Sequence, residues 1–159
     1  MMIEPVIICD TPSIIIPKEL FREEKIHEYW NSLCSSSKQE EFGKDELENY
    51  IILYPRQKKE DSIHETTNLF HIIREKFPEQ TEAVCINVYE DTFCLLVIKN
   101  REITYSGYFQ YTVKEDVLYH VANISQHFFE NNHRINYYYQ HLSPAILRLL
   151  NTCFEIKKL

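Results

Sequence analysis

The sequence predicts an α/β protein in which a mixed sheet carries helices on both faces. Residues 84–89 alternate between Val or Ile and other residue types, and this period of two indicates a β-strand. Phe93–Ile98 is apolar at every position, which is typical of a strand covered on both sides. Residues 103–111 extend the strand pattern, and residues 112–130 then show helical periodicity. Together these features indicate layers of helix on sheet.

The pairing of these three strands can be predicted from their turns and apolar residues. We expect a three-residue turn that sets Tyr89 opposite Phe93, and then a two-residue turn that sets Lys99 opposite Glu102. This register places the following apolar and aromatic residues on one face: Val84, Ile86, Val88, Cys94, Leu96, Ile98, Ile103, Tyr105, Phe109 and Tyr111. A slip of one residue would move such a set to the other face, so the pattern favours this pairing.

Shorter elements are predicted around this meander. The expected strands are 5–9, 13–16, 49–54, 135–139 and 152–156, and the expected helices are 17–33, 62–76, 112–130 and one beginning at Ser143-Pro144. Capping boxes are predicted at Ser62 with Glu65 and at Thr112 with Glu115. We expect one compact unit, with an N-terminal α/β half over residues 1–80 and a second half over residues 81–159.

Composition and charge exclude several classes of function. The chain has 159 residues, and 17 basic against 24 acidic residues give a net charge of −7 without a basic patch, which argues against nucleic-acid binding. No apolar run approaches the roughly 18 residues of a membrane span, so we expect no membrane insertion. Residues 1–10 lack the basic residues of a signal peptide, which predicts a cytoplasmic protein.

The five cysteines predict free thiols rather than disulfides. They stand at irregular spacing without a Cys-x-x-Cys pair, at positions 9, 34, 85, 94 and 153. The predicted register places Cys85 and Cys94 on opposite faces, where they cannot form a bridge. Cys34 is not predicted to be a catalytic nucleophile, because it lies in a serine-rich segment.

Several short motifs are spread over nearly the whole chain: Ile16–Phe21, His64–Leu69, Tyr108-Phe109 and Glu115–His120. They resemble an uncharacterised bacterial family with a ribonuclease-H-like, actin-like ATPase fold, itself distantly similar to actin-like pilus-assembly proteins. The order strand, strand, strand, helix, strand, helix from residue 83 is similar to one lobe of that fold. The resemblance implies three antiparallel strands, with later strands parallel to the first. Members of that family are longer at the N-terminus, so we expect an incomplete first lobe here.

The residues do not match the sites of active relatives. Actin-like ATPases enclose phosphate with glycine-containing turns, whereas Gly43 and Gly107 lie elsewhere and the first hairpin carries Glu90 and Asp91. Ribonuclease-H-type nucleases need a carboxylate in the middle of the first strand, where this chain has Asn87. We therefore expect no catalytic residue and no cofactor.

Other acidic residues and the histidines have simpler explanations than catalysis or metal binding. Glu115 and Asp116 are interpreted as helix-capping and dipole partners. The pairs His64/His71 and His120/His127 would each share a helix face, but their spacing of seven is not the spacing of three or four that one helix uses for chelation. We therefore expect no metal site.

Our first hypothesis is a non-catalytic protein-interaction or scaffold module. The alternative is a nucleotide-dependent enzyme of the actin-like ATPase superfamily with an atypical site. The chain contains 11 Tyr, a residue type that favours interfaces, and the predicted edge strand Ile103–Tyr111 carries no charge. We expect this edge to be covered by the N-terminal half, by a second copy in a homodimer or by a strand of a protein partner. Ser106, Tyr108 and Gln110 are the predicted interaction residues.

Overall fold

The computed structural model describes residues 6–9, 11–33, 41–56, 62–130 and 135–159. The chain divides into two compact units, residues 1–68 (unit 1) and residues 69–159 (unit 2). The helix α2 (Glu65–Lys76) contains the boundary between them. The division at residue 80 that we expected from sequence stays a prediction.

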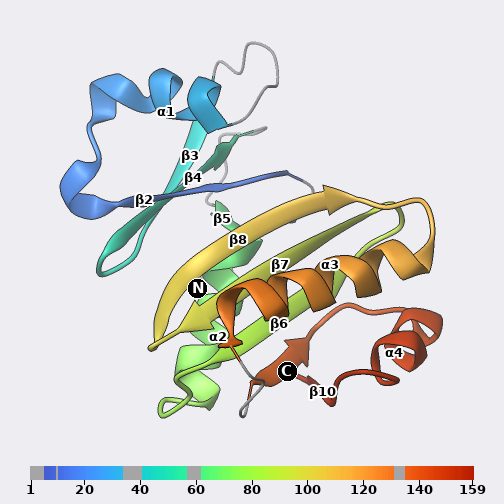
Figure 1. Ribbon diagram of the computed structural model, residues 1–159. Helices are drawn as coiled ribbons and strands as arrows, with labels where there is room; N and C mark the ends of the chain where they lie inside the picture. The colour runs from blue at the N-terminus through green and yellow to red at the C-terminus, as the bar shows by residue number, and fades with distance from the viewer. Residues whose placement is uncertain (1–5, 10, 34–40, 57–61, 131–134) are drawn as a thin grey trace, which may run out of the picture. The chain divides into compact units, whose positions relative to one another are not determined.

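Unit 2 is built on a five-stranded mixed sheet with the order β10-β9-β6-β7-β8 (Figure 1). Its strands are β6 (Ala83–Val88), β7 (Thr92–Lys99), β8 (Glu102–Gln110), β9 (Asn136–Tyr139) and β10 (Ile156–Lys158). The first three are antiparallel, β9 runs parallel to β6, and β10 runs parallel to β9. This confirms the strand order that the family resemblance implied, and β8 is the edge strand, as expected.

Helices cover both faces of this sheet, as the sequence predicted. The helices α3 (Lys114–Phe128) and α4 (Pro144–Leu150) share one core with apolar side chains of all five strands. The part of α2 from Leu69 onward lies on the opposite face, as both figures show. There the Phe77 ring, just after α2, stacks on Tyr138 of β9 with the ring centroids 4.9 Å apart. Below, the face of the sheet covered by α3 and α4 is called the α3 face, and the opposite face is called the α2 face.

The predicted register between β6 and β7 is wrong by one residue. Val88 lies opposite Phe93 and Ile86 opposite Leu95, because the turn has two residues and Tyr89 N donates to Thr92 O at 2.8 Å. Phe93, Leu95 and Val97 therefore lie on the α3 face, whereas Cys94, Leu96 and Ile98 lie on the α2 face. Since β7 is buried at every position from 92 to 98, its apolar pattern fits either register.

The same shift brings the two central cysteines to one face. Cys85 lies opposite Leu96 and Cys94 lies opposite Asn87, so both belong to the α2 face and the prediction of opposite faces is wrong. Both are nevertheless free thiols, as are Cys9 and Cys153. Cys34 lies outside the described residues. Burial raises the pKa of the Cys85 thiol to about 12, which makes it an inert core residue rather than a nucleophile.

The turn between β7 and β8 was predicted correctly, but the strand after it contains a bulge. Asn100 and Arg101 both have positive φ, 53° and 70°, as a two-residue type I′ turn requires, and Lys99 lies opposite Glu102. Ile98 then pairs with Ile103 but Val97 pairs with Tyr105, so Thr104 is the extra residue of a bulge. The bulge places Ile103 on the α2 face, away from Tyr105.

Two of the three predicted caps differ from the structure. At α3, Asp116 Oδ2 accepts hydrogen bonds from Thr112 N at 2.9 Å and Val113 N at 3.1 Å, so Asp116 replaces Glu115 as the capping residue. These two backbone donors hold the pKa of Asp116 below its ordinary value. Ser62 lies in a strand, and α2 begins only at Glu65. Ser143 caps α4 as predicted, since its Oγ accepts from Ile146 N at 3.3 Å.

Unit 1 contains two small sheets. β1 (Val6–Ile8) pairs parallel with β5 (Ser62–His64), and an antiparallel sheet has the order β2-β4-β3. The latter strands are β2 (Ile14–Pro17), β4 (Tyr50–Pro55) and β3 (Phe42–Glu46). Short 3-10 helices at Lys18–Leu20 and Glu23–Lys25 precede α1 (Ile26–Leu33). The single helix predicted over 17–33 is therefore wrong in its first half, where Phe21 and Arg22 have extended backbones.

The only two glycines of the chain both lie in strands beneath aromatic rings. A Cβ at Gly43 of β3 would overlap the ring of Tyr54 on β4. A Cβ at Gly107 of β8 would overlap Tyr105 and Phe109, which flank it on the same strand. Glycine in a strand loses side-chain packing, and here the space it leaves is filled by these rings.

Candidate functional site

Asn87, at the position where a nuclease of this fold needs a carboxylate, has a structural role. Its side chain is fully buried, and Oδ1 accepts hydrogen bonds from Gln140 N at 2.8 Å and His141 N at 3.0 Å. Val88 N donates in turn to His141 O at 2.8 Å. The amide oxygen of Asn87 thus fixes the chain after β9 against the end of β6.

The turn after β6 is closed by hydrogen bonds and carries two exposed carboxylates. Tyr111 N donates to Asp91 O at 3.0 Å, and the Tyr111 hydroxyl donates to Tyr89 O at 2.7 Å. Burial raises the pKa of Tyr111, and the negative charges of Asp91 and Glu90 raise it further. A phosphate at this turn would meet the same negative charges, which disfavour its binding.

The remaining acidic and histidine candidates do not converge. Asp116 is occupied by the α3 cap, and the described residues contain no cluster of three or more His, Cys, Asp or Glu that could hold a metal ion. His64 belongs to β5 and only His71 belongs to α2, so the expectation that these two share a helix face is wrong. In α3, the His120 ring lies 4.5 Å from Phe109 and packs as an aromatic residue.

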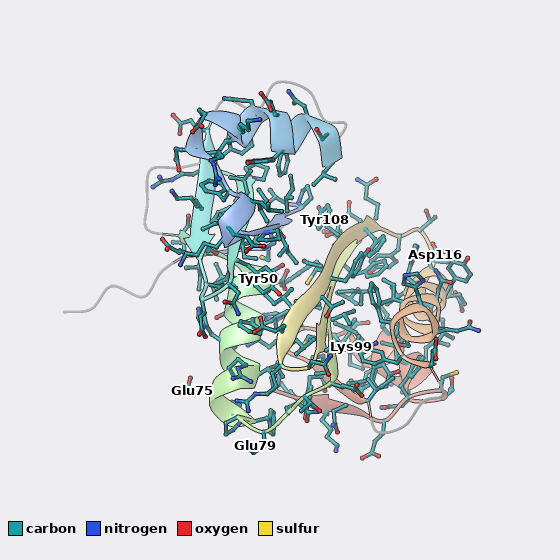
Figure 2. All side chains as sticks on the ribbon, turned by 60° about the vertical axis from the view of Figure 1, so that its left-hand side comes forward. Tyr50, Glu75, Glu79, Lys99, Tyr108 and Asp116 are labelled. Carbon is teal, nitrogen blue, oxygen red and sulfur yellow. The ribbon has the colours of Figure 1, made fainter. Side chains whose placement is uncertain are left out.

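The predicted interaction residues lie together on the edge strand. Ser106, Tyr108 and Gln110 are opposite Leu96, Cys94 and Thr92 of β7, which places all three on the α2 face. Ser106 and Tyr108 are half-buried and Gln110 is exposed. Figure 2 shows Tyr108 on β8, while α3 with Asp116 covers the other side of the sheet. Residues 103–113 carry no charge, and the bulge at Thr104 leaves Tyr105–Gln110 as a regular stretch.

A pocket of about 380 Å³ lies at the C-terminal end of α3. It is lined by Glu82, Lys99, His127, Phe128, Phe129 and Glu130. Lys99 Nζ donates to Phe128 O at 2.9 Å and lies 5.9 Å from the centre of the Phe129 ring. The cation thus neutralises the negative end of the helix, so its charge already has a local structural use.

Unit 1 contains a buried polar cluster formed by Thr11, Asp45, Tyr54, His64 and Thr66. The two Asp45 carboxylate oxygens accept from the Tyr54 hydroxyl at 2.9 Å and from His64 N at 2.7 Å. The Tyr54 hydroxyl also lies 2.8 Å from Ser62 O. Burial, strengthened by the Asp45 charge, raises the pKa of Tyr54 to about 12. The cluster joins β3, β4, β5 and the start of α2.

Sequence reasoning missed this cluster because it missed β3. Three of the five residues of this strand are charged, and a fourth is glycine. The sequence carries no alternation of apolar and polar residues here, and the period of two appears only in the burial, since Gly43 and Asp45 are buried while Lys44 and Glu46 are exposed. A buried Asp then needs donors, which Tyr54 and His64 supply.

The strand order of unit 2 and the helices on both faces of its sheet are those of the actin-like ATPase fold. A Bacteroides thetaiotaomicron protein "with actin-like ATPase fold and unknown function" has a similar solved structure, with a TM-score of 0.81 and 15% sequence identity. The match covers 98% of this chain and 67% of that chain. At this identity the likeness establishes the fold alone.

The chain belongs to the family described as "Protein of unknown function (DUF3822)", whose model matches residues 5–138. This agrees with the uncharacterised family on an actin-like fold that the sequence motifs indicated. No curated protein matches the chain. In the described part of the chain, no helix is long and apolar enough to cross a membrane.

Proposed function

We propose that this protein is a non-catalytic protein-interaction or scaffold module built on a degenerate actin-like fold. The observation that carries this proposal is Asn87, whose side-chain oxygen is used by two backbone N–H groups rather than left for a ligand. The acidic, glycine-free turn at Glu90 and Asp91 supports it, because phosphate-binding turns need close backbone approach and donors. We further propose that the protein acts in the cytoplasm.

The alternative function is a nucleotide-dependent enzyme with an atypical site, and a thermal shift measurement separates the two. A nucleotide at 100 times its Kd would stabilise the folded chain by about 2.7 kcal/mol. For a chain of this length that corresponds to a rise in Tm of roughly 5–10 °C. We expect no shift with ATP and Mg²⁺ and none with ADP. A concentration-dependent rise in Tm with ATP would refute the non-catalytic reading.

We propose the edge strand β8 as the interaction surface of this module. Its terminal place in the sheet order and the lack of charge after Glu102, over residues 103–113, support the proposal, because exposed edges usually carry charge, Pro or a bulge. The bulge at Thr104 protects only one end of the strand. Cover by the N-terminal half, a homodimer through two copies of β8, and a partner's added strand are the three arrangements to be separated.

Sedimentation of a charge variant tests this surface. The double variant Ser106→Lys, Gln110→Lys adds two cations to the α2 face of β8, and the matched control Asn123→Lys adds one to the exposed surface of α3. We expect the wild type to sediment as a dimer, or with a captured partner, and the double variant as a folded monomer. If the wild-type protein sediments as a monomer without a bound partner, β8 is not an interaction surface.

A further inference from the structure

His64 caps the helix α2 through its side chain, whereas most helices are capped by Ser, Thr, Asp or Asn. The helix begins at Glu65, and Thr66 N donates to His64 Nδ1 at 3.1 Å. On the other side of the ring, Nε2 lies 2.9 Å from the carbonyl oxygen of Thr11, between β1 and β2. Only 3% of the residue is exposed, so these contacts are shielded from water.

These two contacts define the protonation state of the imidazole. A backbone N–H can only donate, so Nδ1 accepts and carries no hydrogen. A carbonyl oxygen can only accept, so Nε2 carries the hydrogen. The ring is therefore the neutral Nε2–H tautomer. A proton on Nδ1 would leave Thr66 N–H without its acceptor and would add positive charge at the positive end of the helix.

Among the residues that the structure describes, titratable groups near the ring come from β3, β4 and α2. From β3, Asp45 accepts from His64 N, and from β4 the Tyr54 ring lies 5.3 Å from the imidazole, centre to centre. From α2, Glu65 is 2% exposed and adjoins His64 in the chain. The carboxylates of Asp45 and Glu65 favour a cation by their charge. The lost cap, the helix end and the burial of the ring act in the opposite direction.

We propose that His64 is a pH-sensitive cap that joins β5 to the first turn of α2 only while its ring is neutral. An unfolded histidine takes up a proton near pH 6.5, whereas the folded ring resists it. The unfolded chain then binds more protons, so the stability of unit 1 is complete above about pH 6.5 and is lost as the pH falls. Protonation of Nδ1 releases the first turn of α2, whereas Nε2–H still donates to Thr11 O.

Urea unfolding of the full chain, followed by tryptophan fluorescence, tests this proposal. Trp30 is the only tryptophan and lies in the core of unit 1, so its emission reports on that unit. His64→Asn keeps a capping oxygen but does not titrate. Between pH 7.5 and 5.5, the unfolding constant of the wild type should rise about tenfold relative to that of His64→Asn. The control His71→Asn, at an exposed position of α2, should follow the wild type.

A measurement on the wild type keeps the proposal testable if His64→Asn does not fold. Nitrogen-15 NMR of the histidine rings should show Nδ1 of His64 without hydrogen and Nε2 with hydrogen at pH 7.5. The Thr66 amide should lose its protection from hydrogen exchange at pH 5.5. A hydrogen on Nδ1 at pH 7.5, or parallel pH dependence of the wild type and His64→Asn, would overturn the proposal.

Discussion

Replacing Asn87 by Ala should destabilise unit 2 by about 2–4 kcal/mol. The change removes the acceptor of two hydrogen bonds, from Gln140 N and His141 N, at a fully buried position. Leaving a buried N–H without a partner costs about 1–3 kcal/mol, and water can reach these two groups in part. For a chain of this length each kcal/mol shifts Tm by roughly 2–4 °C, so we expect a fall of about 4–16 °C.

Thermal unfolding followed by far-ultraviolet circular dichroism measures this loss. Asn123→Ala is the matched control, because Asn123 is exposed on α3 and its Tm should stay near that of the wild type. Asn87→Asp keeps an oxygen acceptor and should lose less than Asn87→Ala. If Asn87→Ala melts within about 2 °C of the wild type, the side chain has no structural role. The position would then have to be reconsidered as part of a ligand site.

Two further predictions concern the central strand β7 and the N-terminal cap of α3. Leu96→Ala should lower the free energy of unfolding in urea by roughly 2–5 kcal/mol, because Leu96 is 1% exposed in the central strand β7. A loss below about 1 kcal/mol would contradict the fold. Asp116 has a lowered pKa, so its cap stabilises α3 at neutral pH and this contribution disappears as the pH falls through the folded value. Asp116→Asn should therefore be less stable than the wild type at pH 7 and equal to it in strong acid, and an equal difference at both pH values would contradict the assignment.

The sequence predicted most of the elements of unit 2 because their periodicity is strong. β6 alternates between apolar and other residues, and Val84, Ile86 and Val88 share one face, as predicted; this face packs against α3. β7 gives no such signal, since it is buried at every position from 92 to 98, and its register depends on whether the turn has two residues or three. Local chemistry specifies this turn weakly, because neither Glu90 nor Asp91 requires one turn type.

Unit 1 and its polar cluster were harder to predict because their contacts join residues far apart in the chain. Asp45 and His64 are 19 residues apart, and His64 and Thr11 are 53 apart. A pattern of spacing within one helix or strand cannot reveal such pairs. At the superfamily site, by contrast, the expectation that the usual chemistry is absent needs only the residue types at Asn87, Glu90 and Asp91, and it stays a prediction.

The two glycines under aromatic rings restrict the way in which this family can change. At position 43, a larger residue requires the ring at position 54 to shift or to be replaced, since a Cβ there overlaps Tyr54. Position 107 is restricted in the same way by Tyr105 and Phe109. Sequences that diverged from this one should therefore vary at each glycine in concert with the aromatic residues that lie over it.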